Sequence, residues 1–85
     1  MEKFYTYIIY SATLDKFYIG HTRDLIERIS QHNSGVSTFT SKANDWTLKW
    51  AKEFDNRASA RLLEQEIKNK KSRKFLLQLI QSLQP

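Results

Sequence analysis

Two segments near the N-terminus are dominated by aromatic and β-branched side chains. In residues 4–10, apolar side chains occupy both alternating faces of the expected strand, which is typical of a central strand covered on two faces. Residues 17–20 form a second, shorter β-rich run, and the polar stretch between the two runs contains the turn signal Asp15-Lys16. This pattern predicts a β-hairpin at the start of the chain.

A helical period follows the hairpin. Thr22 is a candidate N-cap, Asp24 lies in the expected first turn, and Gly35 is a suitable stop signal. The sequence therefore predicts a helix over residues 23–34. The side chains expected on its buried stripe are Leu25, Ile29 and His32.

The next segments are a loop and a third strand. Residues 34–45 are rich in Ser, Thr, Asn and Gly, with Phe39 as the one large apolar residue. They predict a loop longer than a connector needs, which could approach a substrate. Residues 46–54 alternate and predict a half-exposed strand. The side chains expected to share one of its faces are Trp46, Leu48, Trp50 and Phe54.

Two helices are predicted at the C-terminal end. Apolar residues recur at helical spacing over 58–70 and again over 75–83, with a short break near residues 70–72. Asn56 is a candidate cap for the first of these helices. The predicted order is β-β-α-β-α-α. This is an α/β (α+β) fold with a small three-stranded antiparallel sheet flanked by helices.

Length and composition narrow the class of protein. Because chains use roughly 100–200 residues per domain, we expect residues 1–85 to form a single domain. No apolar run approaches the roughly 20 residues that cross a bilayer, and the N-terminus lacks the layout of a signal peptide. We therefore expect a soluble, cytoplasmic protein with no membrane partner. The absence of cysteine excludes disulfides, thiolate metal sites and cysteine nucleophiles.

Positive charge is concentrated at the C-terminal end. The net charge is +5, and because residues 1–56 are balanced, residues 57–85 carry the whole excess. Such a block is typical of phosphate contact, although a solvated helical face explains it equally well. The basic residues that we expect at nucleic acid are His21, Arg23, Lys68, Lys70, Lys71, Arg73 and Lys74.

Several side chains have the chemistry for acid–base or phosphate reactions. The four tyrosines all fall between positions 5 and 18, and a tyrosine can accept a proton if cations lower its pKa, although strands favour tyrosine anyway. Arg28 and His32 are four residues apart, so they share one helical side and could hold one phosphate. The alternatives are that Arg28 is an ordinary exposed arginine and that His32 is a partly buried residue of the apolar stripe.

Glu64 borders the apolar stripe of the helix expected over residues 58–70, where a carboxylate needs a partner. A divalent metal is one candidate, because Mg²⁺ is often held by one or two carboxylates together with substrate phosphates and water. An ion pair on the helix surface with Arg57, Arg61 or Lys68 is the other. The sequence leaves both open.

Four stretches together carry a family resemblance. They are Thr6-Tyr7-Ile8, Phe17-Tyr18-Ile19-Gly20, residues 24–35 and residues 60–68. An intact Tyr-Ile-Gly, an arginine ten residues after its tyrosine and a glutamate in an Ala-x-x-x-Glu helix form a fairly specific combination. The chain resembles the GIY-YIG endonuclease superfamily over nearly its whole length. It is most similar to the small stand-alone bacterial members.

The resemblance implies a metal-dependent endonuclease that hydrolyses phosphodiester bonds in DNA, in repair or recombination. It implies one divalent ion, Mg²⁺ or Mn²⁺, held by Glu64. It places Tyr7 and Tyr18 at the two motif tyrosines, one of which, more often the second, activates the attacking water. Arg28 matches the arginine that stabilises charge on the phosphate, and His32 matches a position held by His or Tyr.

The sequence also departs from the family pattern. Tyr5 replaces the glycine of the first motif, and His21 stands where some relatives have Lys or Ser, in a place where it could assist proton transfer. Residues 70–74 offer no counterpart of an asparagine that some relatives carry. Because a chain this short has no room for an added recognition domain, we expect DNA shape, a protein partner or a homodimer to direct the domain to its substrate.

Two other classes of function fit the same sequence. One is a non-catalytic nucleic-acid-binding module, in which aromatic residues stack on bases beside the basic C-terminal helix. The other is a protein-interaction domain whose charges only keep it soluble. The presence of all five candidate catalytic residues favours the nuclease over the binding module, and the salt dependence of DNA affinity distinguishes it from the interaction domain.

Overall fold

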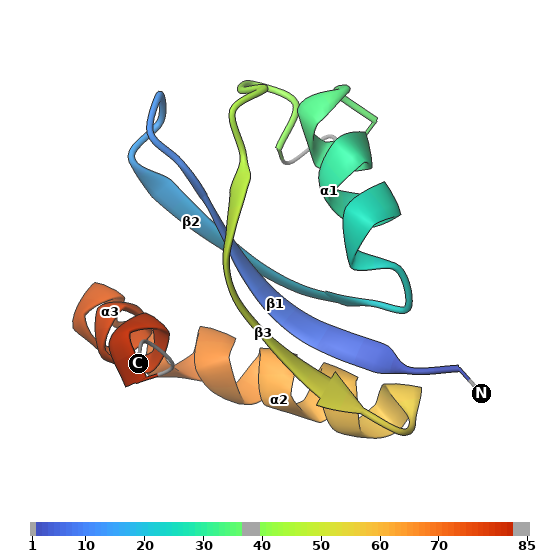
Figure 1. Cartoon of the computed structure of the whole chain (residues 1–85). Coiled ribbons are helices and arrows are strands. Elements are labelled where there is room, and N and C mark those ends of the chain that lie inside the picture. The colour runs from blue at the N-terminus through green and yellow to red at the C-terminus, as the bar shows by residue number, and fades with distance from the viewer. Residues whose placement is uncertain (1, 37–39, 83–85) are drawn as a thin grey trace.

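The computed structural model of the chain describes residues 2–36 and 40–82. Within these residues the elements are β1 (Phe4–Ser11), β2 (Lys16–Thr22), α1 (Leu25–Asn33), β3 (Thr47–Phe54), α2 (Arg57–Lys70) and α3 (Arg73–Ser82) (Figure 1). The predicted β-β-α-β-α-α order is confirmed, and each boundary lies within two residues of the predicted one. Phe39 and Leu83, which the sequence pattern assigns to the long loop and the last helix, lie outside the described residues.

The sheet is antiparallel with the strand order β2-β1-β3. Its central strand β1 is buried on both faces, as the doubly apolar pattern predicts. Helix α1 covers one face, and α2 and α3 cover the other (Figure 1). The two resulting cores are centred on Tyr7, Ile9 and Trp46 beside α1, and on Ile8, Trp50 and Ile67 beside α2 and α3.

Strand β3 contains an irregularity that the sequence pattern does not predict. Its pairing with β1 shifts between Ile8 and Ile9: Ile8 lies opposite Trp50, whereas Ile9 lies opposite Leu48. Lys49 is therefore an extra residue in β3, which makes this position a β-bulge. Because side chains alternate along a strand, one extra residue reverses the faces of everything that follows.

The bulge separates the two tryptophans. Trp46 packs in the core beside α1, whereas Trp50 packs in the core beside α2 and α3. The expectation that Trp46, Leu48, Trp50 and Phe54 share one face is therefore wrong. The first two precede the extra residue and the last two follow it.

Capping side chains explain where the helices begin. The carboxylate of Asp24 accepts a hydrogen bond from the backbone N–H of Glu27 at 3.0 Å, so Asp24 is the N-cap of α1 in place of the predicted Thr22. The hydroxyl of Ser72 accepts from the backbone N–H of Phe75 at 3.1 Å. Ser72 thereby starts α3 two residues earlier than the apolar spacing alone indicates.

Other turn and cap signals act as predicted. Asn56 is the N-cap of α2, because its side chain accepts from the backbone N–H of Ser59 at 2.8 Å. Asp15 adopts a φ of 52° in the hairpin turn, and Gly35 adopts a φ of 83° just after α1. These are left-handed conformations, which glycine and short polar residues adopt most readily.

Gly20 lies opposite Tyr7 in the pairing of β1 with β2. A methyl group added to Gly20 would lie 2.5 Å from the Tyr7 hydroxyl oxygen and 2.7 Å from the ring carbon that bears it. We expect Gly20→Ala to lower the free energy of unfolding by about 1–3 kcal/mol, because the overpacked ring must move. Urea denaturation measures this loss.

A double mutant tests whether the clash with Tyr7 is the cause. Combining Gly20→Ala with Tyr7→Phe removes the closest atom, so part of the lost stability should return as a coupling energy between the two sites. Wild-type stability in the single Gly20→Ala variant would contradict the packing argument.

Candidate active site

A chain of buried hydrogen bonds lies between β1 and α1. The Tyr7 hydroxyl is 2.8 Å from Nε2 of His32, and Nδ1 of the same ring is 2.7 Å from Oγ1 of Thr40. All three side chains are at most 1 % exposed. Both ring nitrogens of His32 therefore have hydrogen-bond partners inside the protein. His32 shares a side of α1 with Arg28, as predicted. It is fully buried, however, so it lies beneath the surface where a phosphate would bind.

Burial sets the protonation of this pair. It raises the pKa of Tyr7 to about 12, against the opposing influence of the Arg28 guanidinium. Burial, together with the positive charge of Arg28, lowers the pKa of His32 to about 4. At pH 7 both side chains are therefore neutral, and Tyr7 is held as a phenol.

Tyr18 is the more accessible of the two motif tyrosines. It is half-buried on β2, an edge strand of the sheet. Its ring centroid is 4.9 Å from that of His32 and 6.5 Å from that of Tyr7. The ammonium group of Lys68 lies 5.9 Å from the centre of the Tyr18 ring. Tyr18 therefore stands between the buried network and a cation at the sheet edge.

Arg28 is half-buried on α1, one turn before His32. Its guanidinium donates to Oε1 of Gln31 at 2.9 Å, and the Gln31 amide donates in turn to Glu27 at 3.2 Å. Its charge acts on the pKa of both Tyr7 and His32. The guanidinium is thus held close to the buried network by its own helix.

Glu64 reaches the site from α2, on the other face of the sheet. It is 8 % exposed, and its two oxygens have separate partners. Oε1 is 2.5 Å from Nδ1 of His21, and Oε2 accepts from the Lys68 ammonium at 2.6 Å. Burial alone would raise the pKa of Glu64, but the hydrogen bonds and charges of Lys68 and His21 outweigh it and hold that pKa below its usual value. Of the predicted ion-pair partners, the structure selects Lys68.

These side chains meet around the edge formed by β2. Tyr7 and Tyr18 lie on the α1 side, whereas His21 and Glu64 lie on the α2 side. Glu64 nevertheless acts on Tyr7, since its negative charge contributes to the raised pKa of that residue. The structure thus brings all five predicted catalytic residues together from four different elements: Tyr7, Tyr18, Arg28, His32 and Glu64.

Glu64 is also the residue best suited to hold a divalent ion. Residues 2–36 and 40–82 contain no group of three or more His, Asp or Glu side chains that could form a complete protein cage. A single buried carboxylate fits an ion such as Mg²⁺, which keeps several waters and takes substrate phosphate oxygens as ligands. At least one carboxylate partner must move aside for the ion. Lys68 can do so because its side chain is 41 % exposed.

The predicted basic residues do not form one uniform surface. Arg23 pairs with Glu2 at 3.5 Å, and Lys70 lies over the Phe75 ring at 5.5 Å. Arg73 pairs with Asp15 at 2.6 Å and thereby ties α3 to the hairpin. His21 and Lys68 contact Glu64. Lys71 and Lys74 are exposed near the junction of α2 and α3.

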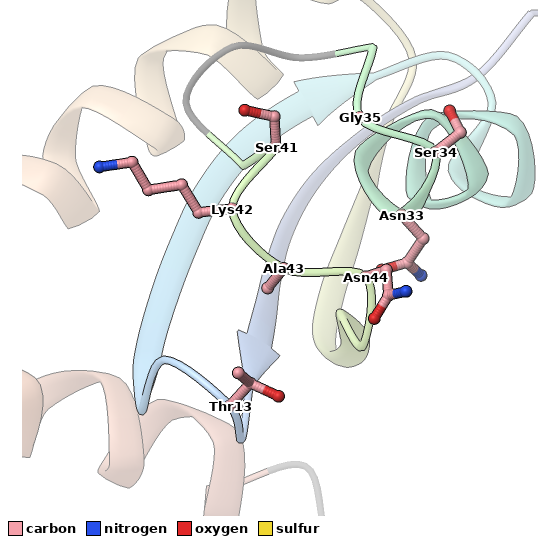
Figure 2. A pocket seen from close by; sticks show the side chains of 8 residues that line it. All are labelled: Thr13, Asn33, Ser34, Gly35, Ser41, Lys42, Ala43 and Asn44. Carbon is pink, nitrogen blue, oxygen red and sulfur yellow. The ribbon is translucent and has the colours of Figure 1, made fainter.

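The long loop after α1 makes a separate hollow. Figure 2 shows this polar cavity of about 340 Å³, lined by Thr13, Asn33 and neighbouring residues including Ser41 and Lys42. None of the predicted site residues lines it. Thr40, which directly precedes this lining, instead reaches inward to His32. That contact was missed because a loop has no periodicity that could indicate it.

The comparisons with known proteins agree with this geometry. Residues 3–77 match the model of the GIY-YIG catalytic domain, so the chain belongs to the GIY-YIG family of nuclease domains. It is also 36 % identical over 84 residues to the UPF0213 protein YsiG of Lactococcus lactis subsp. lactis (strain IL1403), an alignment that covers 96 % of this chain and 79 % of that protein. No solved structure matches the chain.

Family membership defines the general activity. The GIY-YIG domain implies an endonuclease, and its substrate is a nucleic acid. Across the part of the chain that the structure describes, no helix combines the length and the apolar character needed to cross a bilayer.

Proposed function

We propose that the chain is a divalent-metal-dependent endonuclease that hydrolyses phosphodiester bonds in DNA, with a role in repair or recombination. The observation that carries the proposal is the arrangement at the edge of β2. There the Lys68 ammonium that pairs with the buried Glu64 carboxylate also lies over the Tyr18 ring, and the charge of Arg28 acts on Tyr7 beside Tyr18. These are the groups that phosphodiester hydrolysis requires: a proton acceptor, a stabiliser of negative charge and a metal ligand.

In this proposal each residue has a defined role. Glu64 holds one Mg²⁺ or Mn²⁺ ion, which supplies polarisation of the scissile phosphate when bound. Tyr18 in its phenolate form accepts the proton of the attacking water and becomes a phenol, since it is the accessible tyrosine at the edge. Arg28 stabilises the negative charge that develops on the phosphate oxygens.

Tyr7 and His32 act behind these groups. Both are neutral and buried, so neither exchanges protons readily with solvent near pH 7. Their rings lie beside the ring of Tyr18, and both lie within the influence of the Arg28 charge. Their contribution is to fix positions, and this fixing counts because misplacing a reacting group by about 1 Å can slow a reaction by about 100-fold.

Basic side chains outside the site supply affinity for DNA. Lys68 pairs with Glu64 and already lies over the Tyr18 ring, so that if the Glu64 carboxylate held a metal ion, the ammonium would be released at a place where it can pair with a substrate phosphate. The exposed residues near the α2–α3 junction add contacts that do not depend on sequence but do depend on salt. Targeting by a protein partner or by a second copy of the chain remains a prediction.

Cleavage assays test the proposal directly. Supercoiled plasmid, single-stranded DNA and branched DNA are incubated with the purified protein in Mg²⁺, in Mn²⁺ or in chelator. We expect nicks or breaks in at least one substrate with either ion and none with chelator, as gel electrophoresis detects. Intact substrates that the protein still binds would contradict the proposal and favour the non-catalytic binding module. Cleavage that persists in chelator would contradict the role given to the metal.

A further inference from the structure

A residue outside the recognised motifs completes the hydrogen-bond chain behind the catalytic groups. Thr40 is fully buried, and its hydroxyl oxygen is 2.7 Å from Nδ1 of His32. The backbone carbonyl of Thr40 accepts from the indole N–H of Trp46 at 3.0 Å. Both the side chain and the backbone of Thr40 are therefore fixed, and the position of Nδ1 is fixed with them.

The direction of the hydrogen bonds is determined at the Tyr7 end of the chain. The positive guanidinium of Arg28 acts on the Tyr7 hydroxyl and favours an orientation in which a lone pair of the oxygen, and not its hydrogen, faces the charge. Among the described residues, the acceptor within hydrogen-bonding distance of the Tyr7 hydrogen is Nε2 of His32, at 2.8 Å. Nε2 must therefore be unprotonated.

The single N–H proton of the neutral imidazole must then be on Nδ1. A neutral imidazole carries a single N–H, and if Nε2 accepts, that proton is on Nδ1. Nδ1 donates it to Oγ1 of Thr40. The hydrogen bonds accordingly run from Tyr7 to His32 and from His32 to Thr40, which leaves the lone pairs of the Tyr7 oxygen facing Arg28.

We infer that Thr40 is a positioning residue of the active site, which fixes the Nδ1–H tautomer of His32 and so keeps the lone pairs of the Tyr7 oxygen facing the charge of Arg28. The inference rests on the proposed function, in which Arg28 meets the phosphate. Without an acceptor at position 40, the proton can move to Nε2. The Tyr7 hydrogen then turns toward the guanidinium, and Arg28 loses its attraction to the Tyr7 oxygen.

This role also accounts for a feature of the chain that a simple connection does not need. Residues 34–46 connect α1 to β3, which is more residues than most connections between elements use. Thr40, within this connection, reaches Nδ1 of His32 on α1. A hydroxyl is required there, because a valine of the same shape offers no acceptor.

The tautomer can be measured without any activity. Long-range ¹H–¹⁵N correlation spectra of ¹⁵N-labelled protein at pH 7 distinguish a protonated from an unprotonated ring nitrogen. We expect Nδ1 to carry the proton of His32 in the wild type and in Thr40→Ser, which keeps the hydroxyl. In the isosteric variant Thr40→Val we expect Nε2 to become protonated in part or all of the molecules.

Cleavage rates supply the second readout. Thr40→Val should lower kcat by about 10- to 100-fold, with a smaller effect on KM, because Arg28 is misplaced while the DNA-binding surface is intact. Thr40→Ser should cleave at close to the wild-type rate. This rescue distinguishes loss of the hydroxyl from general damage at a buried position.

Several results would overturn the inference. They are a wild-type spectrum with the proton on Nε2, a Thr40→Val spectrum that keeps the wild-type tautomer, and a changed tautomer with an unchanged cleavage rate. If Thr40→Val does not fold, the wild-type spectrum still decides the tautomer. If the wild type cuts no DNA, the proposed function fails and the catalytic role of Thr40 fails with it, whereas a proton on Nδ1 would still support its control of His32.

Discussion

Glu64→Gln should reduce metal-dependent DNA cleavage by about 1,000-fold or more, the largest loss expected from any single replacement in this chain. The glutamine keeps the size of the side chain and an oxygen acceptor but removes the negative charge that attracts the ion. Initial cleavage rates in Mg²⁺ measure the loss. Fluorescence anisotropy with labelled DNA should show that binding is retained, because the basic side chains are unchanged.

Glu66→Gln provides the matched control. Glu66 lies on the same helix and is exposed, so its replacement changes the net charge equally without touching the site. It should cleave like the wild type. Equal losses in Glu64→Gln and Glu66→Gln would show that overall charge, and not a metal ligand, governs the rate. A fully active Glu64→Gln variant would remove the carboxylate from the mechanism.

Tyr18→Phe should lower kcat by roughly 100- to 10,000-fold, the range that a positioned acid–base group contributes. The phenylalanine ring keeps the packing against His32, where the centroids are 4.9 Å apart, so the fold and the affinity for DNA should be preserved. Single-turnover cleavage rates separate this chemical step from binding. Thermal denaturation checks that the variant is folded.

Two other tyrosines serve as comparisons. Tyr10 donates to Asp15 in the hairpin, away from the site, so Tyr10→Phe should cleave normally. Tyr7→Phe removes the partner of His32 and should reduce the rate less than Tyr18→Phe does, through the position of Arg28. If Tyr7→Phe is inactive and Tyr18→Phe is active, the roles of the two tyrosines must be exchanged.

The order of elements could be predicted because local signals and packing agree. Asn56 caps α2 as its residue type indicates, and the doubly apolar β1 is the central strand. The bulge at Lys49 could not be predicted, because the alternation of residues 46–54 is the same with or without it. It depends on pairing with a strand that is distant in the sequence.

Some residues of the candidate site could likewise be predicted, and others could not. Motif residues at fixed spacings predict Tyr18, Arg28 and Glu64, and the pairing of Lys68 with Glu64 follows from their spacing of four residues on one helix. The pairing of His21 with Glu64 joins an edge strand to a helix far along the chain. Thr40 lies in a segment with no period, so its contact required the fold itself.

The bulge in β3 also has a spectroscopic consequence. It places one indole in each layer of the molecule: Trp46 beside α1, bonded to the carbonyl of Thr40, and Trp50 beside α2 and α3, where its ring N–H has no hydrogen-bond partner among the described residues. The two chromophores thus have different surroundings and lie on opposite faces of the sheet. The chain contains its own pair of optical reporters, one for the layer that holds the tyrosines and one for the layer that holds the carboxylate.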